Sequence, residues 1–185
     1  MNRYFPVVTV KDPKDVIPTL QALRDYGINC AEITFRTSFA KQAIEEGVKA
    51  FPDMEIGAGS VHDCKTAMEA IEAGAKFVFS AGFSAEVAKV CQRAEVPYVP
   101  GIATATELVT AVNAGCMTVK FFPAELLGGV KMIKALSAPF PQVKFIPTGG
   151  VDRSNMDEYL ALPQVVGVGG SFFVKEALAK EKEKE

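Results

Sequence analysis

The chain has 185 residues, of which 49% are hydrophobic and 23% charged, and its formal net charge is −2. These values are typical of a soluble globular protein with one sizeable core. A net charge of −2 provides no excess of basic residues to attract nucleic acid or an anionic membrane, and we expect neither as a partner. No stretch has the length and apolar character of a signal peptide or a membrane span, which predicts a cytoplasmic protein.

The cysteine and histidine content argues against a disulfide framework and against an imidazole-rich metal site. The four cysteines are widely spaced and form no CxxC pair, which indicates reduced core residues: Cys30, Cys64, Cys91 and Cys116. His62 is the one histidine, and we expect it at the surface rather than in catalysis. We expect no metal and no other cofactor.

Eight short apolar runs along the chain predict eight strands. They cover residues 5–10, 30–35, 55–60, 77–82, 98–102, 118–123, 145–150 and 165–170. Amphipathic stretches at helical period follow them, over residues 16–27, 39–51, 64–75, 85–95, 106–115, 130–138, 155–162 and 172–180. Strict strand–helix alternation favours a parallel sheet, and eight units predict a compact α/β (βα)₈ TIM barrel. An open doubly wound sheet is the alternative.

Residues typical of helix caps support the prediction of eight strand–helix units. Several helices are followed by a glycine, as in C-terminal caps: Gly27, Gly74 and Gly115. Several are preceded by a candidate N-cap side chain: Ser38, Asp63, Ser84, Thr104 and Asp152. We expect one barrel domain over residues 1–185, with a charged, solvated tail from about residue 178.

Charged residues stand inside two of the predicted strands, where burial is costly. In AEITFRT, strand alternation places Glu32, Thr34 and Arg36 on one face, and the apolar residues between them suit the helix layer. In VKFFPAE, Lys120 and Phe122 likewise share a face. In a barrel both sets face the interior near the carboxyl ends of the strands, where active sites lie.

Two interpretations of these charges remain open. In one, Glu32 forms a buried ion pair with Arg36 or Lys120 for packing specificity, although such pairs are weak stabilisers once desolvation is counted. In the other, burial and the Arg36 cation favour a neutral Lys120 amine that attacks a carbonyl. Glu32 then moves protons, and Arg36 grips a substrate carboxylate with its bidentate fork.

Glycine-rich ends of the last two strands suggest an anion site. PTGG (147–150) and GVGGS (167–171) place Gly149, Gly150, Gly170 and Ser171 in the loops that often hold phosphate in such barrels. The alternative is that these glycines serve tight turns alone. Ser60, in GAGS at the end of the third strand, either bonds a substrate oxygen or caps the following helix.

The motifs together resemble the bacterial 2-keto-3-deoxy-6-phosphogluconate (KDPG) aldolase family, also known as 2-keto-4-hydroxyglutarate (KHG) aldolase. The matching segments run from Phe5 to about Ala177: AEITFRT, IGAGSV, PGIATATE, VKFFPAE, KFIPTGGV and VGVGGS. The resemblance implies a class I aldolase on a homotrimeric (βα)₈ barrel, needing no metal. It also implies pyruvate and a phosphorylated keto acid as small-molecule partners, in the Entner–Doudoroff route of carbohydrate metabolism.

The resemblance also implies a role for each matching residue. Lys120 would form a Schiff base with the C2 carbonyl, and Glu32 would transfer protons through a water. Arg36 would contact the pyruvate carboxylate, and Phe122 would line the site. Substrate phosphate would be held by the strand-end residues Gly149, Gly150 and Ser171.

Three departures from the family pattern are expected to matter. Ser60 stands where the family often has threonine, which keeps the hydroxyl. Ser80-Ala81-Gly82 replaces the usual SPG, so Ala81 stands in place of a proline that lines the pocket. The family's usual N-terminal helix, which caps the barrel bottom, is lacking here, and we expect an exposed apolar patch there.

The leading hypothesis is reversible cleavage of 2-dehydro-3-deoxy-6-phosphogluconate to pyruvate and glyceraldehyde 3-phosphate. One alternative is the same chemistry on 2-keto-4-hydroxyglutarate or a 6-phosphogalactonate analogue. Another is a phosphate-binding barrel isomerase that works without an imine, and a third is a non-catalytic barrel.

Overall fold

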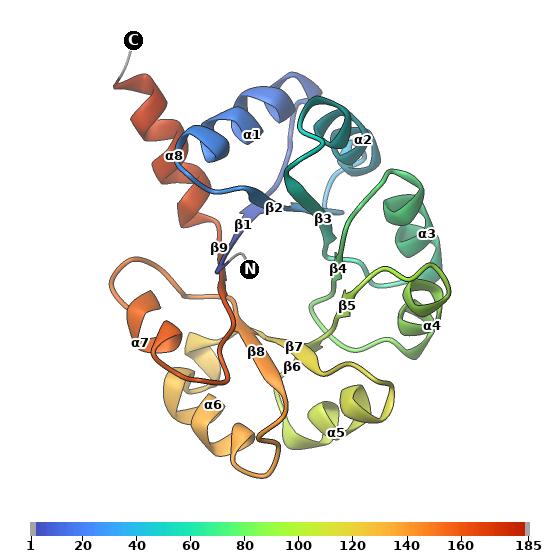
Figure 1. The fold of residues 1–185 in the computed structure, drawn as a ribbon, viewed down its shortest axis with the longest axis vertical. Coiled ribbons are helices and arrows are strands. Elements are labelled where there is room, and N and C mark those ends of the chain that lie inside the picture. The colour runs from blue at the N-terminus through green and yellow to red at the C-terminus, as the bar shows by residue number, and fades with distance from the viewer. Residues whose placement is uncertain (1–2, 184–185) are drawn as a thin grey trace.

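The computed structural model describes residues 3–183, and within them a ring of short strands is surrounded by helices (Figure 1). The strands are β1 (Tyr4–Val8), β2 (Cys30–Thr34), β3 (Glu55–Gly59), β4 (Val78–Phe79), β5 (Tyr98–Val99), β6 (Gly101–Ile102), β7 (Thr118–Phe121), β8 (Lys144–Pro147) and β9 (Val168–Gly170). The helices are α1 (Val16–Asp25), α2 (Ala40–Ala50), α3 (Cys64–Glu72), α4 (Ala85–Arg93), α5 (Ala105–Asn113), α6 (Gly129–Ser137), α7 (Met156–Leu160) and α8 (Phe172–Lys182). Short 3₁₀ turns precede α1 and α6, over Pro13–Asp15 and Glu125–Leu127.

The strands pair in parallel and close on themselves. One sheet has the order β5-β4-β3-β2-β1-β9 and the other the order β6-β7-β8. Pro100 separates β5 from β6, which are consecutive parts of one barrel strand. Bridges between Phe145 and Val165 and between Thr148 and Gly169 join β8 to the β9 segment. The predicted (βα)₈ barrel is therefore confirmed, and the open doubly wound sheet is excluded.

Most of the predicted helix ends are where the sequence places them. Gly27, Gly74 and Gly115 have left-handed φ angles of 89°, 89° and 84°, which glycine adopts without a Cβ penalty. N-cap side chains accept backbone N–H groups at the predicted starts of α3, α4 and α5, and these residues are Asp63, Ser84 and Thr104.

Two of the predicted N-caps are wrong. The N-cap of α2 is Phe39 rather than Ser38, and the N-cap of α7 is Asn155 rather than Asp152. The Asp152 carboxylate instead accepts the backbone N–H of Ser154 at 2.8 Å, which closes a local turn before the helix begins.

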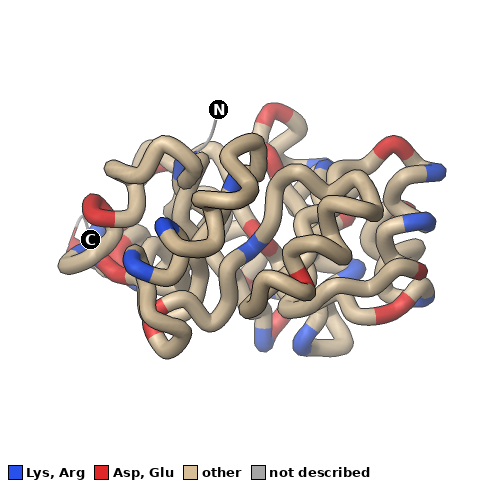
Figure 2. The backbone as a smooth tube through the Cα atoms, turned by 90° about the horizontal axis from the view of Figure 1, so that it is seen from below, with Lys and Arg blue, Asp and Glu red and all other residues tan. Residues whose placement is uncertain are grey.

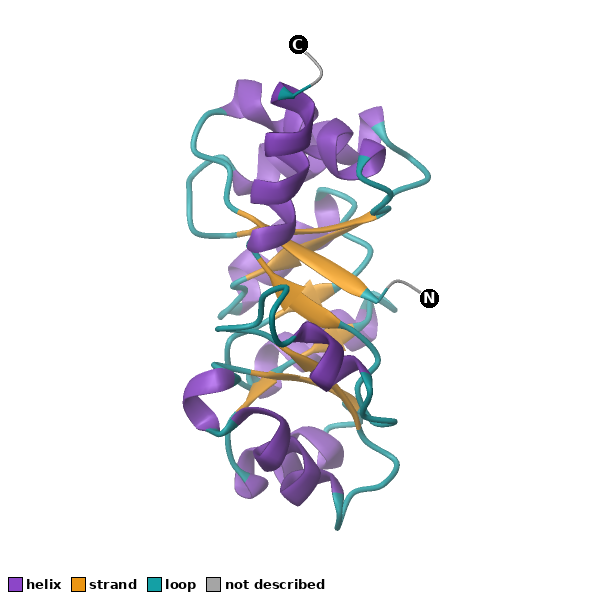
Figure 3. Ribbon diagram, turned by 90° about the vertical axis from the view of Figure 1, so that its left-hand side faces the viewer, coloured by secondary structure: helices purple, strands orange, loops and turns teal. Residues whose placement is uncertain are grey.

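The core has an outer layer between strands and helices and an inner layer within the barrel, and the strands form the middle of the molecule in side view (Figure 3). Glycines of β3 make room for large inward side chains from neighbouring strands. A Cβ at Gly57 would lie 2.3 Å from the Phe77 ring, and a Cβ at Gly59 would lie 2.1 Å from Oε1 of Glu32. The sequence GAG in β3 is therefore what allows a carboxylate and an aromatic ring inside the barrel.

Basic and acidic positions are interspersed over the molecule rather than gathered by sign (Figure 2). The cysteines are free, and three of them are buried: Cys30, Cys91 and Cys116. Among residues 3–183, no helix combines the length and the apolar character needed to cross a membrane.

Candidate active site

Lys120 and Glu32 form a buried ion pair across the barrel interior. Lys120 lies on β7 and Glu32 on β2, which belong to different sheets. Nζ of Lys120 donates to both carboxylate oxygens of Glu32, at 2.8 and 2.9 Å. The exposed fractions of the two residues are 5% and 1%. Of the two partners considered for Glu32 from the sequence, Lys120 is the one that the structure pairs with it.

Phe79 completes the immediate surroundings of the lysine. Nζ of Lys120 lies 5.2 Å from the centroid of the Phe79 ring, within cation–π range. Phe79 is the last residue of β4 and is almost fully buried. The amine thus has a carboxylate as hydrogen-bond partner and an aromatic ring beside it, in a site screened from bulk water.

Arg36 and Ser60 form a second polar pair, in the loops after β2 and β3. Nε of Arg36 donates to Oγ of Ser60 at 2.8 Å, and the backbone N–H of Phe35 donates to the carbonyl of Gly59 at 2.8 Å. Ser60 has a φ of 57°, a left-handed conformation that costs a non-glycine residue. The residue that caps α3 is Asp63, so Ser60 does not start that helix, and its hydroxyl accepts from Arg36 instead.

The loops after β7 and β8 are joined through their backbones. The N–H groups of Ala124 and Glu125 donate to the carbonyls of Thr148 and Gly149, at 2.8 and 3.1 Å. Gly149 and Gly150 have φ angles of 96° and 79°, so both positions require glycine. The phenolic O–H of Tyr159 donates to the Glu125 carboxylate. Desolvation by burial, followed by this hydrogen bond to Glu125, raises the pKa of Tyr159.

The adjoining strand end supplies the remaining residues of the predicted anion site. The Thr148–Gly169 bridge places the end of β9 beside the PTGG loop. A Cβ at Gly170 would lie 2.6 Å from the Phe172 ring, so the chain turns tightly there. Ser171 is exposed, holds the N-cap position of α8, and makes no capping bond with its side chain.

Phe122 and Ala81 lie in loops that meet neighbouring barrel segments. Cδ2 of Phe122 is 3.3 Å from the position of a Cβ at Gly149, so the ring borders the glycine loop. The carbonyl oxygen of Ala81 is 2.0 Å from the position of a Cβ at Gly101, which shows how closely the loop after β4 approaches the next strand. Ala81 itself is exposed, and so is His62.

Two residues near the site were not predicted. Phe79 beside Lys120 is one, and strand alternation with the inward Phe77 could have placed it. Thr148 is the other: its buried Oγ1 has no hydrogen-bond partner in the described structure. Alternation with Ile146, which pairs in register with Lys120, indicates the same inward face.

A parallel barrel with a buried lysine paired to a carboxylate, an arginine nearby and glycine loops at its last strands has the features of a lyase that works through a lysine imine. No group of three His, Cys, Asp or Glu side chains within residues 3–183 is arranged to hold a metal ion.

The comparisons with known proteins agree with this class. The family model described as KDPG and KHG aldolase matches residues 1–185. A 2-dehydro-3-deoxy-phosphogluconate aldolase of Treponema pallidum is 46% identical over 172 residues, which cover 93% of this chain and 82% of that protein. The KHG/KDPG aldolase of Escherichia coli K12 is 40% identical, over 91% of this chain and 79% of that protein.

A solved structure of the same family is also similar to this chain in fold and sequence. The KDPG aldolase of Legionella pneumophila, with pyruvate captured at low pH as a covalent carbinolamine, superposes with a TM-score of 0.92 at 41% identity. The superposition covers 98% of this chain and 88% of that one. This chain belongs to the KDPG and KHG aldolase family, and the resemblance noted from its motifs is confirmed.

Proposed function

We propose that this protein is a class I aldolase that reversibly cleaves 2-dehydro-3-deoxy-6-phosphogluconate to pyruvate and glyceraldehyde 3-phosphate, with Lys120 as the Schiff-base residue. The observation that carries the proposal is the buried Lys120–Glu32 pair, at 2.8 and 2.9 Å, inside a barrel of this family. A buried pair adds little net stability, so its presence in the barrel centre favours a chemical role.

The first half of the proposed reaction forms the imine. Glu32 takes a proton from the Lys120 ammonium, and the neutral amine attacks the C2 carbonyl to give a carbinolamine. Protonation of the carbinolamine hydroxyl by Glu32 lets water leave, and an iminium cation remains. Because both oxygens of Glu32 already reach Nζ, this carboxylate needs little movement to act as base and then as acid.

The second half breaks the carbon–carbon bond. Glu32, a carboxylate again once water has left, takes the C4 hydroxyl proton, and the C3–C4 electron pair moves into the iminium, which releases the aldehyde and leaves an enamine. Glu32 returns that proton to C3, and hydrolysis of the resulting imine by water gives pyruvate and restores the amine. The Phe79 ring beside Nζ favours cationic nitrogen, so it supports the iminium without supplying a proton.

In this proposal, residues on both sides of the Lys120–Glu32 pair bind the substrate. Arg36 is held at Nε by Ser60, and a guanidinium fixed there still presents its terminal nitrogens to a carboxylate. Phe122 borders the opposite loop, and Ala81 lies on the loop after β4. Phosphate is assigned to the backbone of Gly149, Gly150 and Gly170 and to the Ser171 hydroxyl at the N-terminus of α8.

Borohydride trapping tests the central step. The protein is incubated with pyruvate, reduced, digested and analysed by mass spectrometry, and we expect a reduced pyruvyl adduct on the peptide that carries Lys120. Lys120→Ala should lose the adduct and all turnover while circular dichroism shows a folded barrel. An adduct on another lysine, or substantial turnover by folded Lys120→Ala, would contradict the assignment.

A substitution at the proposed phosphate site distinguishes the phosphorylated substrate from 2-keto-4-hydroxyglutarate. Ser171→Ala should lower kcat/KM for the phosphorylated substrate by about tenfold, because one hydrogen bond to a charged group is lost. The same variant should leave kcat/KM for 2-keto-4-hydroxyglutarate unchanged, since that substrate has no phosphate. Equal effects on both substrates would argue against phosphate at Ser171.

We also propose a cytoplasmic homotrimer that works in the Entner–Doudoroff route. The free cysteines support a reducing compartment, and the trimer rests on resemblance to the family. Sedimentation equilibrium should give three times the chain mass of 19.8 kDa. A mass of one or two chains would contradict the trimer and leave the imine chemistry untouched.

A further inference from the structure

Two threonine hydroxyls are hydrogen-bonded to each other at the carboxyl ends of β1 and β2. Oγ1 of Thr9 and Oγ1 of Thr34 are 2.9 Å apart. In the parallel pairing of these strands, Val7 lies opposite Glu32, and the same register continued by two residues brings Thr9 beside Thr34. Because strand residues alternate, Thr34 has the inward side of Glu32. Both hydroxyls therefore lie at the mouth of the barrel that holds the active site.

The Thr34 hydroxyl lies at the same level of the barrel as the Glu32 carboxylate. Thr34 pairs in register with Gly59 of β3, whereas Glu32 pairs with Gly57. A Cβ at Gly59 would nevertheless overlap the carboxylate of Glu32, so this side chain extends along the strands to the level of Thr34. The two threonine hydroxyls are therefore in the same layer as the group that moves protons in the proposed reaction.

Burial decides which of the two hydroxyls donates. Thr34 is fully buried, and among the described residues its hydroxyl has no partner other than Thr9. A buried O–H without an acceptor is costly, so Thr34 donates and Thr9 accepts. Thr9 is exposed, and its own proton finds no acceptor within residues 3–183, so that proton is available to a ligand in the mouth. A hydroxyl that accepts one hydrogen bond is also polarised to donate a stronger one.

Thr9 stands between the two ends of the proposed substrate site. In the sheet, β1 lies between β2 and β9 (Figure 1). The loop after β2 carries Arg36, which is assigned to the substrate carboxylate. Gly170 and Ser171, at the end of β9, are assigned to the substrate phosphate. A substrate held at both ends therefore has its middle carbons over the end of β1.

Building on the proposed function, we propose that Thr9 donates a hydrogen bond to the C5 hydroxyl oxygen of the phosphorylated keto acid. The C4 hydroxyl is engaged by Glu32, which takes its proton, and C5 is the next carbon toward the phosphate. Pyruvate ends at C3 and makes no such contact. Thr9 thus selects for a hydroxylated aldehyde half of the substrate, and Thr34 is a positioning residue that fixes the direction in which Thr9 donates.

The test compares cleavage of the substrate with cleavage of its 5-deoxy analogue, which lacks only the C5 hydroxyl, by measuring released pyruvate. Thr9→Val keeps the shape of the side chain and removes its O–H. We expect this variant to lower kcat/KM for the substrate by about five- to tenfold, mainly through a higher KM, because one hydrogen bond is lost. For the 5-deoxy analogue, kcat/KM should stay within about twofold of the wild-type value. Thr9→Ser keeps the hydroxyl and should restore most of the loss.

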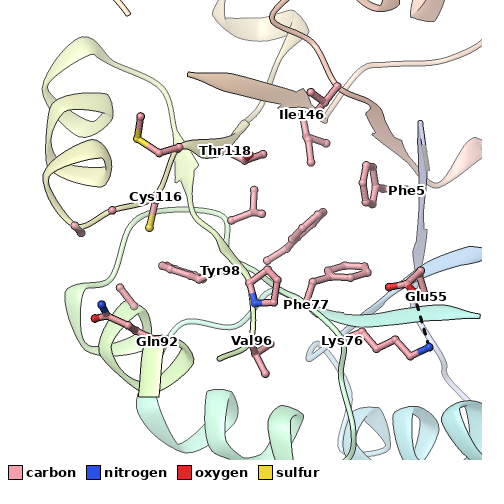
Figure 4. A pocket seen from close by; sticks show the side chains of 18 residues that line it. Phe5, Glu55, Lys76, Phe77, Gln92, Val96, Tyr98, Cys116, Thr118 and Ile146 are labelled. Carbon is pink, nitrogen blue, oxygen red and sulfur yellow. Dashed lines mark ion pairs between the residues drawn. The ribbon is translucent and has the colours of Figure 1, made fainter. Parts of the chain in front are cut away.

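Thr118→Val is the matched control. Thr118 is the first residue of β7, and it lines a pocket at the opposite mouth of the barrel (Figure 4). The same threonine-to-valine change there should leave cleavage of both substrates as in the wild type. Thr34→Val should reduce the preference for the hydroxylated substrate by about threefold, because the Thr9 hydroxyl is then free to turn. Thr34→Ser keeps the donor and should retain the preference.

Equal losses by Thr9→Val on the two substrates, or no loss on either, would overturn the role of Thr9. If circular dichroism shows that Thr9→Val does not fold, Thr9→Ala gives the same comparison. Borohydride trapping with pyruvate keeps this result separate from the imine mechanism, since Thr9→Val should form the adduct on Lys120 at the wild-type rate. A wild type that forms no adduct would overturn the proposed function, whereas an adduct with an unchanged substrate preference would overturn only the assignment of Thr9.

Discussion

At the scale of single residues, the Lys120–Glu32 pair places two charges in the barrel interior, where desolvation is costly. Both side chains are buried, and each is the hydrogen-bond partner that compensates the other's charge. Breaking such a pair leaves an uncompensated charge in a dry site, whereas replacing both partners with apolar residues is often neutral or stabilising. The pair can therefore be tested as a stability element apart from its chemistry.

We predict that Lys120→Met and Glu32→Met each lower the free energy of unfolding by about 3–5 kcal/mol. The double variant should lie within about 1–2 kcal/mol of the wild type, because no buried charge remains in it. Urea unfolding at neutral pH measures all three.

The exposed Arg24–Asp53 pair, at 3.2 Å, is the matched control. Removing either partner there should change the free energy of unfolding by less than about 1 kcal/mol. A double variant at positions 32 and 120 as unstable as the sum of its single variants would mean that the pair does not interact in the folded protein.

Ser60 combines a strained backbone with a hydrogen bond, and two substitutions separate these effects. Ser60→Ala keeps the left-handed strain and loses the bond to Arg36, while Ser60→Gly relieves the strain and loses the same bond. Both should weaken pyruvate binding by about tenfold, since Arg36 is no longer oriented. Ser60→Gly should be more stable than Ser60→Ala by about 1–2 kcal/mol.

Pyruvate binding is read from the concentration dependence of borohydride trapping, and stability from thermal unfolding. Ser60→Thr keeps the hydroxyl and should retain most of the affinity. If Ser60→Ala binds pyruvate as the wild type does, the Arg36–Ser60 contact does not position the guanidinium.

At the scale of elements, the start of α5 has a complete capping box. Thr104 accepts the backbone N–H of Glu107, and the Glu107 carboxylate accepts the N–H groups of Ala103 and Thr104, at 2.8 and 2.9 Å. The bond from Ala103, followed by those from Thr104, lowers the pKa of Glu107 from its usual 4.5. A carboxyl with a lower pKa in the folded state stabilises the fold above its unfolded pKa, and this contribution is lost as the pH falls.

We predict that Thr104→Ala lowers the free energy of unfolding by about 1 kcal/mol. Glu107→Gln should lose less stability than the wild type does between pH 7 and pH 3, because its amide does not titrate. Glu45→Gln, an exposed position on α2, is the control and should follow the wild type. Parallel curves for Glu107→Gln and the wild type would mean that the box adds nothing to pH dependence.

This capping box, like the barrel as a whole, could be predicted because its signals are local. Thr104, Asp63 and the glycines after the helices act within one turn, and strand alternation alone placed Glu32 and Lys120 inside. Asp152 was mispredicted because a local turn competes with helix initiation for the same side chain. Alternation could place Phe79 inside the barrel, but its position 5.2 Å from Nζ of Lys120 depends on how β4 and β7 meet, which no local pattern contains.

At the scale of the whole molecule, the barrel is predicted to be one cooperative unit. Its closure runs through long-range contacts: β1 pairs with both β2 and β9, and bridges join β8 to the segment that contains β9. Losing any strand opens the ring and exposes both core layers. We therefore expect residues in different sectors of the barrel to become accessible together.

Alkylation of the buried cysteine thiols measures whether the sectors of the barrel unfold together. Cys30 lies on β2, Cys91 on α4 and Cys116 just before β7, and alkylation requires the thiolate. Burial, with smaller effects of Glu55 and Glu32, raises the pKa of Cys30 to about 12, and burial raises that of Cys91 to about 11. In the folded protein these thiols are both inaccessible and protonated at pH 8, whereas in the unfolded chain they react.

We predict that brief alkylation at pH 8 along a urea series labels Cys30, Cys91 and Cys116 with one common midpoint, equal to the midpoint seen by circular dichroism. Mass spectrometry of the separate peptides gives each midpoint. Cys64 is only half-buried, and a Cys64→Ser background removes its labelling in the folded state. Labelling of Cys91 and Cys116 at lower urea than Cys30 would divide the chain into two unfolding units, because the ring then opens before the sector around β2 does.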